Sequence, residues 1–585
     1  MVEAPLDVGA TVTMLLEKLL RLERPQITEQ MQPLLETEEA RDLFLSYLLT
    51  PPDHSPSSIK NSYWVSKLLS EDIVGATILK PMYDARFIAT LFGCFRTDTA
   101  PATDDPTTTT TGTTLPTRPW IPHVCVVLSA LLRGQADDFV QVITDTTASF
   151  LVHVTALCAF SSTPMVSGLL QDTVCLPSPL PGQPSISCSP QVQQLLHQRL
   201  AEMDMWYFLV SLVVDPAVPL GRSEAAADCF MTSLKRTAVN ATAALLADSL
   251  IQSAGRIVDT LVTYSHDTFT HSQQVPVDAT TTTRVGLCIH CLLSLLEWTM
   301  PTIVDAPSSA PYQSFGGTMV VSQDNTLHGA FQVAVVKLVE LRTLIFDLLR
   351  QPLQSRATSE DRAIKHTGYV TDSPFTLVRL NLVLVLHKML SSGVEQEALP
   401  VALMAEVPAV LWRLLGTWFC TYPHSSMYHH IFVELFALVL GSGCDIAVKG
   451  IIKRAKKKKK KSDVGFLSRI MRHYDDGDIN SSVRGHILQC LNIVRLRDQV
   501  SLPTSYLSVY LRDLQEWGEF LPRLEAATLS TVAAPPFTVP VKWGELAKTD
   551  YGIELGSPWA KSLGFTVDMD LSVTEDSGDE FTVVD

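Results

Sequence analysis

Residues 377–390 read Leu-Val-Arg-Leu-Asn-Leu-Val-Leu-Val-Leu-His-Lys-Met-Leu, and this stretch decides the fold. Its apolar side chains recur at three- and four-residue spacing, as in Leu377, Leu380 and Leu384, which predicts a helix. Residues 431–440, Ile-Phe-Val-Glu-Leu-Phe-Ala-Leu-Val-Leu, are apolar on more than one side. Such a helix must be covered on several faces, and layers of paired helices achieve this.

The same spacing recurs in blocks along most of the chain, while period-two alternation is scarce. One such block lies near the start, at Met14, Leu16 and Leu20. Each block has about 10 to 20 residues, as globular helices do, and glycine or proline often follows its end. We find no internal repeat with a fixed period. The prediction is therefore an all-α fold, an irregular armadillo- or HEAT-like helical solenoid with disordered loop insertions.

The domain organisation follows from this fold. A solenoid can run longer than a globular domain because each repeat contacts only its neighbours, so the 585 residues fit one array. We expect a helical repeat domain over residues 1–525 and a proline-containing, acidic, mostly disordered tail over 526–585. Polar, threonine-rich, proline-rich or lysine-rich segments predict disordered insertions near residues 97–118, 172–190, 306–325, 355–374 and 453–462.

Composition narrows the class of function. The formal net charge of −16 argues against binding a polyanion such as nucleic acid over a broad face. The apolar runs are shorter than the roughly 20 residues that span a bilayer, and the first residues lack the features of a signal peptide. The 11 cysteines, an odd number, lie mostly in apolar stretches, which suits free thiols in a reducing compartment. We expect a cytoplasmic protein without a membrane span.

Several residues could in principle carry chemistry, but each has a simpler interpretation. Cys288 and Cys291 have Cys-x-x-Cys spacing, yet they lie inside an apolar run without a second pair, which favours a helix core. His424, His429 and His430 lie near one another without an acidic residue at ligand spacing. No phosphate-binding loop, nucleophile elbow or kinase signature occurs. We therefore predict no catalytic residue, no metal and no cofactor.

Two charged segments suggest regulation. Lys453, Arg454 and residues 456–461 form a dense basic run that suits nuclear import or phosphate docking, although a solvated loop is the favoured interpretation. If the basic run serves nuclear import, the protein would be found in the nucleus as well as in the cytoplasm. Ser577 precedes Gly578, Asp579 and Glu580, which makes it a candidate phosphosite for an acid-directed kinase. The alternative is that the acidic tail serves only solubility.

From Leu292 onward, short patterns occur in an order that points to a family. The first is Leu295-Leu-Glu, three residues and Pro301, followed by a leucine-rich helix from Leu341 to Pro352. Next, Arg379-Leu-Asn381 opens the long aliphatic helix. The last patterns are Tyr422-Pro-His-Ser-Ser-Met-Tyr-His429, and then Gly485-His486 with Asn492.

In this order and spacing the chain resembles the SAPS-domain family, the helical regulatory subunits of protein phosphatase 6-type Ser/Thr phosphatases. The likeness covers roughly residues 8–525. His424 stands where the family has Trp, and Ser425-Ser426 replaces a pair of Asn. Residues 97–118 and the lysine run have no fixed counterpart. The chain would therefore be a divergent member.

The resemblance implies a non-catalytic scaffold that holds a phosphatase catalytic subunit, directs its substrate choice and accepts further scaffold or ankyrin-type subunits. Leu380, Leu384 and Phe432 should be buried. The alternatives are a generic armadillo- or HEAT-like adaptor unrelated to phosphatases, or an enzyme with an unfamiliar site near residues 424–430. The residues that we expect to bind the partner are Tyr422, His424, Tyr428, His429, Arg379 and His486.

Deleting residues 97–118 should leave the thermal midpoint nearly unchanged, because shortening a surface loop alters the closure entropy only slowly. Differential scanning calorimetry of the full chain and the deletion variant measures this. A loss of several degrees would show that the segment packs against the helices.

Overall fold

In the computed structural model of the chain the described residues are helical almost throughout, which confirms an all-α, solenoid-like fold. The chain divides into two compact units, Met1–Ile451 and Ile452–Asp585, which are described separately. The structure describes residues 8–22, 26–49, 56–74, 78–93, 120–145, 164–174, 189–238, 243–272, 279–299, 303–304, 320–321, 327–350, 364–366, 369–371, 375–392, 399–452, 465–475 and 481–533.

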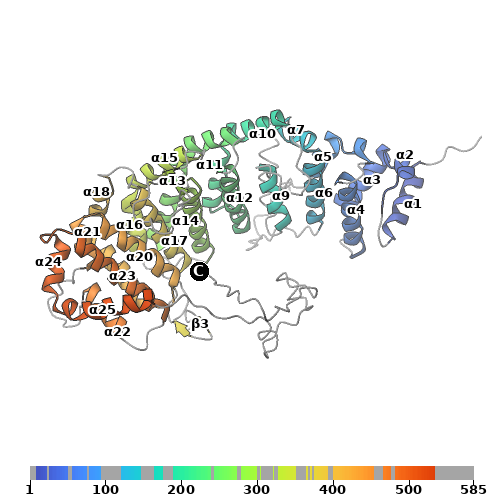
Figure 1. Cartoon of the computed structure of the whole chain (residues 1–585). Helices are drawn as coiled ribbons and strands as arrows, with labels where there is room; N and C mark the ends of the chain where they lie inside the picture. Colours follow the sequence, from blue (N-terminus) through green and yellow to red (C-terminus); the bar gives the residue numbers. More distant parts are fainter. Residues whose placement is uncertain are drawn as a thin grey trace, which may run out of the picture. The chain divides into compact units, whose positions relative to one another are not determined.

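The helices of unit 1 follow one another closely along the chain (Figure 1). Two short 3-10 helices, η1 (Glu29–Met31) and η2 (Lys80–Met82), accompany them. The α-helices are α1 (Val8–Leu20), α2 (Gln32–Leu35), α3 (Glu38–Leu49), α4 (Pro56–Val74), α5 (Ala85–Gly93), α6 (Ile121–Gly134), α7 (Ala136–Asp145), α9 (Pro164–Val174), α10 (Pro190–Glu202), α11 (Met205–Val214), α12 (Leu220–Ala238), α13 (Ala244–Ser272), α14 (Ala279–Thr299), α15 (His328–Glu340), α16 (Arg342–Arg350), α17 (Leu377–Ser391), α18 (Leu399–Glu406), α19 (Ala409–Thr421), α20 (Ser426–Gly441) and α21 (Asp445–Ile452).

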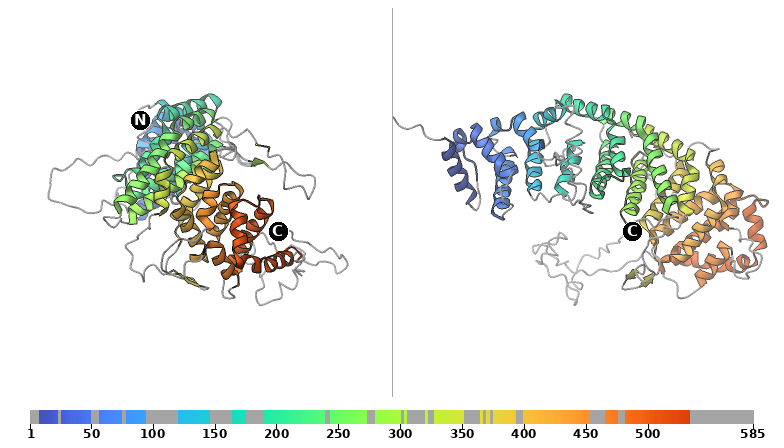
Figure 2. Two further views of the ribbon diagram at one scale, coloured as in Figure 1. Left: turned by 90° about the vertical axis from the view of Figure 1, so that its left-hand side faces the viewer. Right: turned by 180° about the vertical axis from the view of Figure 1, so that it is seen from behind.

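These helices pack in two layers. In one layer α4, α6, α9, α12, α14, α17 and α20 each contact the next helix in the series. In the other, the series is α5, α7, α10, α13, α16 and α19, and pairs such as α6 and α7 or α19 and α20 join the layers. The same row is seen from behind in Figure 2. Each helix thus contacts near neighbours in the chain, as in a solenoid.

Close packing between neighbouring helices depends on small residues at particular points. A Cβ atom at Gly329 of α15 would lie 2.9 Å from Ile251 of α13, and one at Gly450 of α21 would lie 2.7 Å from Trp412 of α19. At Gly329 the flexible end of the Ile251 side chain could shift to make room, whereas at Gly450 the Trp412 ring would have to move. Glycine at the two positions lets the backbones approach.

A buried arginine fixes the turn between α11 and α12. Arg284 of α14 is 3% exposed. Its guanidinium donates to the carbonyls of Val213 (2.9 Å) and Val218 (2.6 Å) and to the hydroxyl of Ser223 (2.5 Å). These bonds satisfy carbonyl groups near the end of α11 that the helix itself leaves open. The side chain has a structural role, since its partners belong to the turn that it holds.

A buried carboxylate holds the chain between α4 and η2 in a similar way. Asp72 accepts hydrogen bonds from the backbone N–H groups of Ile78 (2.9 Å) and Leu79 (3.0 Å) and from the hydroxyl of Tyr83 (2.9 Å). Burial, with the nearby carboxylate, raises the pKa of Tyr83 well above its usual value, so the hydroxyl keeps its proton and donates.

Short strands correct two of the predicted loops. β1 (Ile303–Val304) pairs antiparallel with β2 (Val320–Val321), and β2 lies inside the loop expected at 306–325, whereas β1 lies just before it. β3 (Ile364–His366) pairs antiparallel with β4 (Tyr369–Thr371), inside the loop expected at 355–374. Their β-branched and aromatic residues favour strands. The segments 97–118 and 453–462 lie outside the described residues, as does most of 172–190, where α9 ends at Val174 and α10 begins at Pro190.

The described part of unit 2 contains α22 (Phe466–Asp475), α23 (Ser481–Val500), α24 (Tyr506–Asp513) and α25 (Gln515–Ala533). The boundary expected at 525/526 is wrong, because α25 runs through it. The amide of Asn492 on α23 donates to the hydroxyl of Thr528 (3.0 Å), and Arg495 lies 3.7 Å from Glu525. Packing against α23 thus extends the helix, and Pro535 follows closely after its end.

Among the described residues, α14 is the one helix long and apolar enough to cross a membrane by length and composition alone. In this structure α14 packs against α11, α12, α13, α15 and α17. Its apolar surface is therefore covered by other helices, as in the core of a helical stack.

Replacing Arg284 with Met should loosen the α11–α12 turn, because the change leaves two buried carbonyls and a hydroxyl without their donor. We expect the local opening free energy of residues 211–223 to fall by about 3 kcal/mol, measured by amide hydrogen exchange. Arg133→Met, at an exposed position of α6, is the matched control. Unchanged protection of the turn would contradict the assigned role.

Candidate functional site

The turn between α19 and α20 contains two of the predicted partner-binding residues, Tyr422 and His424. Tyr422 follows the last helical residue of α19 and is half-buried. Pro423 comes next and disfavours a helical conformation at Tyr422, whose φ and ψ are −115° and 67°. The backbone N–H of Ser425 then donates to the Tyr422 carbonyl (3.1 Å), and α20 begins at Ser426. The turn is therefore short and well defined.

Two of the expected binding residues are instead core residues. Tyr428 and His429 are both 0% exposed. The Tyr428 hydroxyl donates to the Leu415 carbonyl (2.7 Å), and His429 Nε2 donates to the Phe419 carbonyl (3.0 Å). They occupy the first turn of α20, on the side that packs against α19. The prediction that they lie on a docking surface is wrong, because neither side chain reaches solvent.

Two other predicted residues are brought together. Arg379, in the first turn of α17, donates from Nη1 to the Tyr422 hydroxyl (3.1 Å). Its guanidinium lies 5.6 Å from the centroid of the Trp418 ring, a cation–π distance. The Nε atom of Arg379 is buried without a hydrogen-bond partner. Among the described residues, no carboxylate forms an ion pair with this arginine.

An aromatic cluster supports this contact, and sequence reasoning missed two of its members. Phe375 lies 5.1 Å from Tyr422, 5.6 Å from Trp418 and 4.5 Å from Tyr428, measured between ring centroids. Two features of the sequence could have identified the cluster. Trp418 and Tyr422 are four residues apart, and Phe375 precedes Thr376, whose hydroxyl caps α17, at the position of a hydrophobic staple.

The remaining predicted residues are not part of this cluster. His424 is exposed on the turn. His486 belongs to α23 of unit 2, where its Nδ1 lies 3.2 Å from the Gln489 side-chain oxygen. Ser577 lies outside the described residues. Of the residues expected to be buried, Leu380 and Phe432 are 7% and 0% exposed, whereas Leu384 is half-buried.

A carboxylate lies four residues after His430, so the expectation that no acidic residue stands at ligand spacing from these histidines is wrong. Glu434 of α20 lies 3.3 Å from His430 and 3.8 Å from His387 of α17. Burial lowers the pKa of His387, and Glu434 opposes this shift only in part. Among the described residues, no group of three or more His, Cys, Asp or Glu side chains is arranged to hold a metal ion.

The buried cysteines have little nucleophilic character. Burial raises the pKa of Cys288 to about 12 and that of Cys291 well above its usual value. A thiol must be deprotonated to attack or to bind a metal. Both thiols therefore stay protonated in the α14 core near neutral pH.

A groove between α4, α6 and α9 has a volume of about 620 Å³ and a mainly apolar lining. Val74 and Met165 are 54% and 52% exposed at this groove. Cys125 also lines it, and burial raises the pKa of that thiol to about 12. The described lining thus offers apolar surface and no activated nucleophile.

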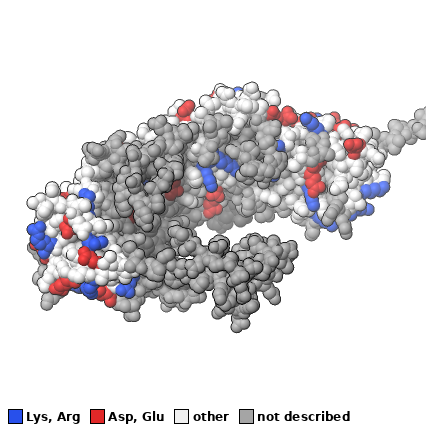
Figure 3. Space-filling view, viewed as in Figure 1, with Lys and Arg blue, Asp and Glu red and all other residues white. Residues whose placement is uncertain are grey.

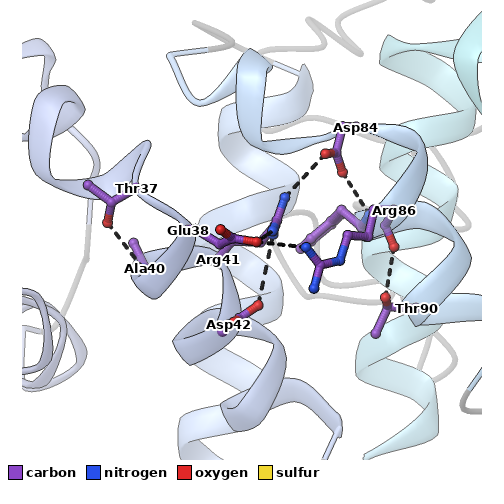
Figure 4. A network of polar contacts seen from close by, with 9 residues as sticks. Thr37, Glu38, Ala40, Arg41, Asp42, Asp84, Arg86 and Thr90 are labelled. Carbon is purple, nitrogen blue, oxygen red and sulfur yellow. Dashed lines mark hydrogen bonds and ion pairs between the residues drawn. The ribbon is translucent and has the colours of Figure 1, made fainter. Parts of the chain in front are cut away.

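A smaller polar pocket lies between α3 and the start of α5, and its charges pair with one another (Figure 4). Glu38 accepts hydrogen bonds from Arg41 (2.7 Å) and Arg86 (2.6 Å), and Arg41 also donates to Asp84 (3.2 Å). Asp84 in turn accepts from the backbone N–H of Phe87 (2.8 Å) at the start of α5. This network joins two helices. In the face that Figure 3 shows, charges of both signs are interspersed.

Comparisons with known proteins add little. No family model matches the chain, and no curated protein matches it. One solved structure, the crystal structure of an engineered protein from the Northeast Structural Genomics Consortium, is 12% identical. The match covers 78% of this chain and 98% of that chain, with a TM-score of 0.20, which is too low to carry an argument.

His429→Ala should lower the free energy of unfolding by about 2 kcal/mol or more, because it leaves a cavity and removes a buried hydrogen bond. His424→Ala, at the exposed position of the same turn, should change it by less than about 0.5 kcal/mol. Urea denaturation followed by tryptophan fluorescence measures both. Equal effects of the two changes would contradict the difference in burial.

Proposed function

We propose that the chain is a non-catalytic regulatory and scaffolding subunit that binds the catalytic subunit of a protein phosphatase 6-type Ser/Thr phosphatase and directs its substrate choice. The observation that supports this most directly is the contact between Arg379 and Tyr422. Each residue opens one of the short patterns that resemble the SAPS-domain family, and 43 residues separate them. Two of these patterns therefore lie side by side in the helical stack.

The architecture supports the same proposal. A stack of helix pairs presents a long surface to partners without a cavity that encloses a substrate. The buried ionisable side chains of the described residues serve the fold. Arg284 holds the α11–α12 turn, and Asp72 holds the chain before η2. The side chains that remain to bind a partner are half-buried or exposed, as at the ends of α17, α19 and α20.

We also propose a cellular location for the chain and further binding partners. We place the subunit in the cytoplasm, with the nucleus as a further location if residues 453–461 act as an import signal. Additional scaffold or ankyrin-type subunits would bind elsewhere on the helical array.

Affinity purification of the tagged chain from its native cells should recover a metal-dependent Ser/Thr phosphatase catalytic subunit, identified by mass spectrometry. The purified catalytic subunit should then bind the purified chain directly in size-exclusion chromatography. An unrelated helical-repeat protein of similar net charge is the control for nonspecific capture.

Three results would contradict the proposal. Recovery of transport or cytoskeletal components without a phosphatase would favour a generic adaptor. Failure of the purified catalytic subunit to bind would remove the phosphatase assignment. Hydrolytic activity that stays with the isolated chain at constant specific activity would identify an enzyme.

A further inference from the structure

One end of the α17–α19–α20 group combines apolar exposure with an arginine that has no acidic partner among the described residues. We call it the Arg379 patch and define it by Phe375, Leu377, Arg379, Tyr422 and Met427. Leu377 and Met427 are 65% and 66% exposed, so each presents a large apolar side chain to solvent. Phe375 and Tyr422 are half-buried and touch each other. All these residues lie in unit 1.

Arg379 gives the patch a positive charge, whereas the net charge of the chain is −16. The first turns of α17 and α20 contain no acidic side chain. Both helices begin at this end, since Phe375, just before α17, contacts Tyr428 in the first turn of α20. Helix N-termini carry a partial positive charge that adds to that of Arg379. The Arg41 guanidinium, by contrast, is neutralised by Glu38 and Asp84.

The guanidinium is held in place before any partner arrives. The Trp418 ring lies beneath it, and the Tyr422 hydroxyl accepts from Nη1. None of the described residues accepts a hydrogen bond from Nη2. A planar guanidinium fixed in this way can donate two parallel hydrogen bonds to a carboxylate, and little side-chain entropy is then lost on binding.

We infer that the Arg379 patch binds an acidic residue flanked by an apolar side chain on the surface of the phosphatase catalytic subunit. Arg379 pairs with the carboxylate, and Leu377 and Met427 cover the apolar neighbour. Arginine, methionine and aromatic residues are enriched at the centres of protein interfaces. This inference rests on the proposed function, but it names a contact that the function alone does not require.

The test uses the full chain, the purified catalytic subunit and isothermal titration calorimetry at low and high salt. Arg379→Glu should weaken binding about tenfold or more, since it replaces an attraction with a repulsion. Met427→Glu should weaken binding by a similar factor. It removes little packing, because Met427 is 66% exposed, and an acidic residue in the first turn of a helix favours folding.

Val410→Glu is the matched control. Val410 is 51% exposed and lies in the first turn of α19, at the opposite end of that helix from Tyr422. The change in charge and side chain is therefore comparable, while the Arg379 patch is untouched. Circular dichroism and the melting temperature of each variant show that it is folded.

The outcomes separate the inference from the proposed function. If the unmodified chain does not bind, the proposed function fails. If it binds and only Arg379→Glu and Met427→Glu weaken binding, the inference holds. Wild-type binding by both variants would overturn the inference alone, and so would equal weakening by all three, which would indicate long-range charge effects. A dimer of the chain that Met427→Glu disrupts would assign the patch to a second copy and also overturn it.

Discussion

The fold depends on the need to cover helices that are apolar on more than one face. α14 shows this most clearly, since Cys288, Leu292 and Leu295 are fully buried by helices from both layers. Burying apolar surface contributes about 25 cal/mol per Å², and here each helix obtains that burial from near neighbours in the chain. Stability is then spread along the array as a sum of local interfaces. Connections of very different length and composition can therefore join the helices without disturbing the stack.

The helices were predictable because their pattern is local. Three- and four-residue spacing in stretches such as 377–390 gives both the helix and its apolar faces. The pairing of β1 with β2 was not predictable in this way. A strand as short as Ile303–Val304 forms only through pairing with Val320–Val321, which lies 16 or more residues further along the chain. The end of α25 was missed for the same reason. Its last turns follow a contact between Thr528 and Asn492 that no local pattern reveals.

The candidate site was predictable only in part. Arg379 and Tyr422 were identified by the patterns that they open, and the structure brings them into contact. Tyr428 and His429 were misassigned because the turn is shorter than the pattern suggests, so both residues already belong to α20 and face α19. Trp418 and Phe375 were overlooked because an aromatic residue at helical spacing is usually core. Whether its edge reaches solvent depends on how neighbouring helices end, and that is a tertiary property.

The arginines of unit 1 show how one residue type acquires different roles from its surroundings. Removing a guanidinium from water costs free energy unless other groups replace the lost hydrogen bonds. Carbonyls and a hydroxyl accept three hydrogen bonds from Arg284, and two carboxylates pair with Arg41, whose buried Nε has no hydrogen-bond partner among the described residues. Among the described residues, Arg379 has the Tyr422 hydroxyl and an aromatic ring but no carboxylate, so no opposite charge offsets the cost of its partial burial. A partner carboxylate offsets that cost only if water is excluded around the new ion pair. Exposed apolar side chains such as Leu377 and Met427, at the same end of the helices, provide that exclusion once a partner covers them.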